Sequence, residues 1–112
     1  MNADAFIQRV INIDGQDVPC RFFKPEADRG NFCCRLEVGW PEGTQSRTIY
    51  GVDEVQALLL AMQTAHTYLL VAREQDGRNV SWLGERRLGL PVADVVRDWD
   101  VGGDVTPPSQ DG

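Results

Sequence analysis

The order of apolar and polar residues predicts an antiparallel sheet in the first half of the chain. Residues 31–40 alternate strictly between the two classes. The residues expected on one face are Phe32, Cys34, Leu36, Val38 and Trp40, and those on the other are Asn31, Cys33, Arg35, Glu37 and Gly39. A period of two with one polar face is typical of a half-buried strand. We therefore expect the Cys34 thiol in the core and the Cys33 thiol on the opposite face.

Shorter runs predict three more strands, at residues 5–13, 18–24 and 45–50. The first two runs are joined by Asp14-Gly15, a dipeptide that favours a tight hairpin turn. Residues 25–30 are polar and are predicted to form a loop. The first half of the chain is thus expected to hold four strands.

A long amphipathic helix is predicted over residues 53–75. Asp53 stands at the N-cap position and Gln56 follows three residues later, which is a capping-box pattern. Apolar residues then recur with the helical period of about 3.6 residues. The face expected to pack on the sheet consists of Val55, Leu58, Leu59, Met62, Ala65, His66, Leu69 and Leu70. Asp76-Gly77 is expected to end the helix.

The last third of the chain has weaker patterns. Residues 78–83 are predicted as a fifth strand, and the apolar spacing over 92–100 permits a short amphipathic helix. The expected fold is therefore α+β, with an antiparallel sheet of four or five strands in the order β-β-β-β-α-β and one long helix on one face. We expect a single domain over residues 1–101 and a mobile tail rich in Gly, Pro and Asp over 102–112.

Composition and charge narrow the classes of partner. The 112 residues include 17 acidic and 11 basic ones, for a formal net charge of −6. Such a chain repels nucleic-acid phosphates, so we expect no nucleic-acid partner. The longest apolar run, residues 57–62, is much shorter than the roughly 20 residues that cross a bilayer, so no membrane partner is expected. Three cysteines and a first segment without signal-peptide character favour a cytoplasmic protein with free thiols.

Candidate catalytic chemistry is sparse. The single histidine, His66, and Cys34 are both expected between helix and sheet, so a thiol–imidazole pair is the one nucleophilic arrangement that the pattern allows. A buried thiol and a core histidine explain the same positions without chemistry. The cysteine spacing fits no zinc motif. We expect no catalytic residues, no metal and no cofactor, and a thiol-dependent enzyme is the third functional hypothesis.

One side of the predicted helix is unusual because it carries no charge between Glu54 and Arg73. A helix side turned to solvent is normally charged, so something is expected to cover this one. Residues 92–100 could fold back over it, or an unknown protein partner or a second copy of the chain could pack on it. The interface candidates on this side are Leu60, Thr64, Thr67, Tyr68 and Val71.

These patterns lead to two main functional hypotheses. The first is a non-catalytic protein-interaction or regulatory module, with a homodimer as one form of it. The second is a small-ligand binding protein that uses a pocket between helix and sheet, with Trp40, His66 and Trp82 as the candidate ligand-binding residues.

The chain also resembles a family of short uncharacterised bacterial proteins, known only as a domain of unknown function. The segments that carry the resemblance are Tyr50-Gly51-Val52-Asp53, Gln56-Ala57-Leu58, Trp82-Leu83-Gly84 and Leu90-Pro91-Val92. They correspond to a strand exit, a helix cap and a core strand, and the similarity extends over roughly residues 5–92. The resemblance implies a shared fold and a bacterial origin, and it assigns no catalytic residue.

Overall fold

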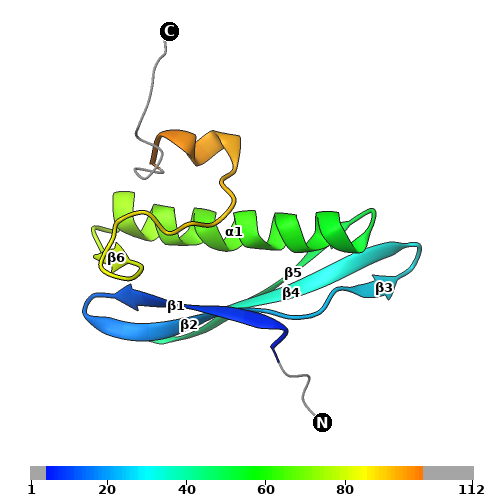
Figure 1. The fold of residues 1–112 in the computed structure, drawn as a ribbon, viewed down its shortest axis with the longest axis horizontal. Coiled ribbons are helices and arrows are strands. Elements are labelled where there is room, and N and C mark those ends of the chain that lie inside the picture. The colour runs from blue at the N-terminus through cyan, green and yellow to red at the C-terminus, as the bar shows by residue number, and fades with distance from the viewer. Residues whose placement is uncertain (1–4, 100–112) are drawn as a thin grey trace, which may run out of the picture.

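The computed structural model describes residues 5–99 and confirms the α+β class. An antiparallel sheet carries the long helix α1 on one face. After α1 the chain first rejoins the sheet, then runs alongside the helix and ends in a short helix on the side of α1 away from the sheet (Figure 1). The strands are β1 (Ile7–Ile13), β2 (Gln16–Phe22), β3 (Glu26–Asp28), β4 (Asn31–Trp40), β5 (Gly43–Gly51) and β6 (Val80–Ser81). The helices are α1 (Glu54–Glu74) and the short 3-10 helix η1 (Asp94–Trp99).

Strand β4 pairs with three other strands, more than any other strand of the sheet. Its first residues pair with β3, residues 36–38 pair with β2, and residues 32–40 pair on the other edge with β5. Strand β1 follows β2 as a hairpin, and β6 adds two residues beside Asn12 and Ile13. The predicted strands therefore all exist, although the expected strand over 78–83 shrinks to the two residues of β6.

The predicted loop over 25–30 is wrong in part, because residues 26–28 form strand β3. Arg29 and Gly30 both adopt positive φ, at 54° and 86°, and turn the chain back onto itself. This tight turn lets Glu26 pair with Cys33 and Ala27 with Phe32. The polar composition of the segment reflects its place at the edge of the sheet.

The predicted faces of β4 are confirmed. Cys34, Leu36 and Val38 are fully buried beneath α1, whereas Cys33 is half-buried on the other face. The strands β1 and β2 add Ile11, Ile13, Val18, Cys20 and Phe22 to the same core. Burial raises the pKa of Cys20 to about 12, and it also raises the pKa of Cys34.

The start of α1 follows the predicted cap. Asp53 Oδ1 accepts a hydrogen bond of 2.8 Å from the Gln56 backbone N–H, and Gln56 Oε1 accepts one of 2.8 Å from the Val52 backbone N–H. Gly51, just before the cap, allows a close approach of strand and helix. A Cβ atom at this position would lie 2.5 Å from the Ala57 backbone nitrogen. The β5–α1 connection is therefore fixed by sterics as well as by hydrogen bonds.

The predicted core face of α1 is partly wrong. Ala65, His66, Leu69 and Leu70 are buried as expected, but Val55 is 65% exposed and Leu59 is 45% exposed. Ala57, Ala61 and Ala65 provide the contact surface at the N-terminal end instead. Their small side chains let the helix backbone lie close to the sheet, which leaves the larger residues at the flanks.

The chain after β6 packs along α1 and closes the second side of the core. His66 Nδ1 lies 3.0 Å from the Pro91 carbonyl oxygen, and Arg73 donates hydrogen bonds to the carbonyl oxygens of Val80, Arg86 and Trp99. The predicted short helix near the C-terminal end is present as η1, which is 3-10 rather than α. The predicted tail over 102–112 lies outside the described residues.

Candidate functional site

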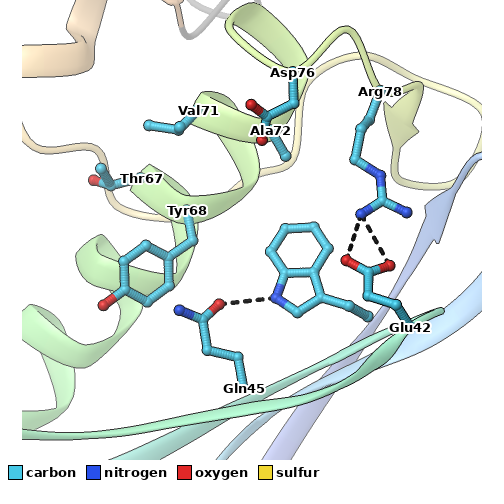
Figure 2. Close-up of a pocket in the computed structure, with 9 residues that line it drawn as sticks. Glu42, Gln45, Thr67, Tyr68, Val71, Ala72, Asp76 and Arg78 are labelled. Carbon is cyan, nitrogen blue, oxygen red and sulfur yellow. Dashed lines mark hydrogen bonds and ion pairs between the residues drawn. The ribbon is translucent and has the colours of Figure 1, made fainter.

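The structure contains a concave site between the C-terminal half of α1 and the β4–β5 turn, with a volume of about 410 Å³. We call it the Trp40 groove. Figure 2 shows helix residues along one side and residues of the β4–β5 hairpin below them. Its lining consists of Trp40, Glu42, Gln45, Thr67, Tyr68, Val71, Ala72, Asp76 and Arg78.

Two aromatic rings form the apolar part of the groove. Trp40 is the last residue of β4, and its indole Nε1 donates a 2.8 Å hydrogen bond to Gln45 Oε1 across the turn. The antiparallel register makes this contact natural, because Trp40 pairs with Gly43 and Val38 pairs with Gln45. Tyr68 comes from α1, and its hydroxyl accepts a 2.5 Å hydrogen bond from Arg47 Nη1. Both rings are thus held in place by polar contacts at their edges.

Arg78 forms a polar clamp at one end of the groove. Its Nη1 donates to both carboxylate oxygens of Glu42, at 2.8 and 3.1 Å, and its Nε donates to Asp14 Oδ2 at 2.9 Å. Asp14 also accepts a 2.9 Å hydrogen bond from the Asn79 backbone N–H. The clamp therefore ties the β1–β2 turn, the β4–β5 turn and the loop after α1 together.

The clamp changes the acidity of its carboxylates. The pKa of Asp14 lies below its ordinary value, mainly because the Asn79 backbone N–H hydrogen-bonds the carboxylate and then because Arg78 does. The pKa of Glu42 is lowered mainly by the hydrogen bond from Arg78. Both groups are therefore ionised at neutral pH, and the charge of Arg78 is fully compensated.

Asp76 provides a second carboxylate beside the groove. Its backbone N–H donates to the Val71 and Ala72 carbonyl oxygens where α1 ends. Within residues 5–99 its carboxylate forms neither a hydrogen bond nor an ion pair. Asp76 is therefore the charged group of the groove that is available to a ligand.

The structure does not bring the three predicted ligand residues together. Trp40 lines the groove, whereas His66 is fully buried against the chain after β6. The indole ring of Trp82 lies under the guanidinium of Arg9, which is 3.8 Å from the ring centroid. A pocket between helix and sheet exists, and of the three predicted residues Trp40 alone lines it.

The predicted interface residues divide between the groove and the open helix surface. Thr67, Tyr68 and Val71 line the groove, and Leu60 and Thr64 lie half-buried nearer the start of α1. Hydrogen bonds of His66 and Arg73 hold the segment after β6 to α1. An interface through these residues, including a homodimer, stays a prediction.

The structure gives no support to the thiol hypothesis in the part of the chain that it describes. The Cys34 thiol is fully buried and donates to the Phe23 carbonyl oxygen at 3.2 Å rather than to His66. Among residues 5–99, no three His, Cys, Asp or Glu side chains are placed to hold a metal ion.

Sequence reasoning missed five residues of the groove, namely Glu42, Gln45, Ala72, Asp76 and Arg78. Two turn signals, Pro41-Glu42-Gly43 and Asp76-Gly77, marked the loops from which three of them come. Nothing in either signal indicates that the two loops meet. Their proximity is a consequence of how α1 lies across β4 and β5.

Comparison with known proteins identifies a family but no individual protein. The family model described as a domain of unknown function, DUF6968, matches residues 7–92, which is more than half of the chain. No curated protein and no solved structure matches the chain.

Proposed function

The chain belongs to the DUF6968 family, a domain of unknown function, and we propose that it is a non-catalytic binding module whose site is the Trp40 groove. The observation that carries this proposal is the groove itself. Its volume of about 410 Å³ lies within the range of ligand pockets, which is roughly 300–1,000 Å³. Its aromatic walls and few polar groups are the combination that such pockets use for affinity and orientation.

The residue types in the groove favour binding over chemistry. Its carboxylates are Glu42, which is bound to Arg78, and Asp76, which stands at the exposed end of α1. The histidine and the two fully buried thiols of Cys20 and Cys34 lie outside its lining. A groove of this kind can hold and orient a small group, either of a free molecule or of a side chain presented by a partner.

The apolar composition of α1 follows from its position between the sheet and the segment after β6. The helix is long and apolar enough to cross a membrane when judged by length and composition alone. A helix packed between a sheet and a returning segment meets the same criterion, because it buries apolar residues on two sides. We therefore propose that α1 serves as one wall of a binding site.

Nuclear magnetic resonance of ¹⁵N-labelled protein tests the proposal. The indole N–H of Trp40 and the side-chain amide of Gln45 report on the groove, and the indole N–H of Trp82 is an internal control. A diverse fragment library at millimolar concentrations should give hits that cluster on Trp40 and Gln45. Hits that scatter, that cluster on Trp82, or that are absent would overturn the proposal.

A matched pair of variants sharpens the test. Val71→Phe fills the groove and should abolish the shifts at Trp40. Val95→Phe makes the same change at a site that is 88% exposed and should leave them unchanged. Equal loss in both variants would show that the shifts do not report on groove occupancy.

A further inference from the structure

We infer that the ligand of the Trp40 groove is a cation with a flat head, namely a guanidinium group. This inference rests on the proposed function and specifies the chemical class that the groove recognises. It is drawn from the charges around the groove, from the aromatic rings that line it, and from the geometry that a guanidinium requires.

The charge around the groove is negative. Asp14, Glu42 and Asp76 bring three carboxylates, against the two guanidinium groups of Arg47, at the Tyr68 hydroxyl, and of Arg78, which is already bound at 2.8 Å to Glu42 and at 2.9 Å to Asp14. The carboxylate of Asp76 remains for the ligand. The whole chain carries a net charge of −6, so its field adds to this local preference for a cation.

The aromatic rings favour the same class. Cations are attracted to the faces of Trp and Tyr rings when they lie within about 6 Å of the ring centroid. The protein already uses this attraction at the groove, where Arg78 lies 5.4 Å from the Trp40 ring and Arg47 lies 5.9 Å from the Tyr68 ring.

A guanidinium fits better than a compact ammonium because it is planar. It can stack on an aromatic face and at the same time present two parallel N–H donors to one carboxylate. The groove has both kinds of partner, since the two aromatic residues and Asp76 are all among the residues that line it. The group could belong to a free guanidino compound or to an arginine of a partner chain, and the chemistry of recognition is the same.

Two probes of nearly equal shape test the inference. N-acetyl-argininamide carries the guanidinium, whereas N-acetyl-citrullinamide replaces it with a neutral urea. In a titration followed at the Trp40 indole N–H, the arginine probe should bind about tenfold more tightly, as expected from one charge-assisted contact of about 1.4 kcal/mol. Equal affinity of the two probes would overturn the inference.

A pair of charge variants locates the contact. Asp76→Asn should weaken the arginine probe about fivefold and leave the citrulline probe unchanged, because one carboxylate is lost. Glu54→Gln removes the same charge about 30 Å away, at the other end of the 21-residue helix α1, and should change neither affinity by more than about twofold. An equal effect of both variants would show that general charge, rather than the groove, attracts the probe.

The outcomes separate this inference from the proposed function. If fragments bind at Trp40 but the arginine probe does not, the cation class is wrong and the groove remains a binding site. If no compound of any class shifts Trp40, both fail. If the arginine probe binds, a peptide with a central arginine distinguishes the source. Tighter binding of the peptide indicates a partner chain, and weaker binding indicates a free guanidino compound.

Discussion

Two tryptophans of this domain lie against arginines, and they differ in what surrounds the pair. The Arg9 guanidinium lies 3.8 Å from the Trp82 ring centroid and donates to the Leu88 and Gly89 carbonyl oxygens at 2.8 and 3.0 Å. Gly89 is packed so closely that a Cβ atom there would lie 2.8 Å from the Trp82 ring. This pair is closed on itself and holds the chain after β6 to strand β1.

The pair at Trp40 is open. Arg78 lies 5.4 Å from the Trp40 ring centroid, and the cavity of about 410 Å³ borders the ring. The polar contacts of Arg78 are with Glu42 and Asp14 at the end of the groove, not across it. The same two residue types therefore act as a structural clasp in one place and as the wall of a candidate binding site in the other.

The largest expected difference between the two pairs is in stability. Trp82→Ala should lower the free energy of unfolding by about 3 kcal/mol, because it removes a packed ring together with its stack on Arg9. Trp40→Ala should cost about 1–2 kcal/mol, because one side of that ring already borders a cavity. Urea denaturation followed by circular dichroism measures both. An equal cost, or a larger cost at Trp40, would contradict the distinction between closed and open pairs.

A smaller effect is expected in the dependence of stability on pH. The folded-state pKa of Glu42 is lowered by Arg78, so the stability that this contact contributes is fully present above the unfolded pKa and is lost as pH falls through the folded pKa. Arg78→Met should therefore be less stable than the parent at neutral pH. The difference should shrink as the pH falls below about 4.3, the ordinary pKa of a glutamate, and on through the lowered folded-state pKa of Glu42.

Protonation of Asp14 should contribute less than that of Glu42 to the shrinking stability difference between Arg78→Met and the parent. The main cause of the lowered Asp14 pKa is the hydrogen bond from the Asn79 backbone N–H, which remains in the variant. Arg9→Met provides the contrast, since Arg9 bonds to carbonyl oxygens that do not titrate in this range. Its stability difference from the parent should stay constant as the pH is lowered from neutral. Denaturation midpoints measured at several pH values compare the two variants.

Much of the fold could be predicted from the sequence because local patterns determine it. The strict alternation over 31–40 places Cys34 and Leu36 in the core, and the Asp53–Gln56 pair marks the start of α1. The core face of the helix could not be predicted fully. Hydrophobicity favours Val55 and Leu59, but the close approach of α1 to the sheet requires the small side chains of its alanines.

The candidate site could be predicted only in pieces. Trp40, Thr67, Tyr68 and Val71 were singled out by the sequence, but under two different hypotheses. These four residues meet in one groove, and Arg78 joins them, because of contacts between residues that are up to 64 positions apart in the sequence. The hydrogen bond from Arg78 to Asp14 is one such contact. Such contacts arise from the topology of the sheet and leave no periodic signal along the chain.

The most direct test of the Trp40 groove as the binding site is a measurement of contacts in solution. Nuclear Overhauser effects between N-acetyl-argininamide and ¹³C,¹⁵N-labelled protein detect protons that lie within about 5 Å of each other, a distance comparable to the ring contacts that cation–π pairing requires. We predict cross-peaks from the side-chain methylene protons of the probe to the ring protons of Trp40 and Tyr68, and none to those of Trp82. Cross-peaks to Trp82, or to neither Trp40 nor Tyr68 under saturating conditions, would contradict the account.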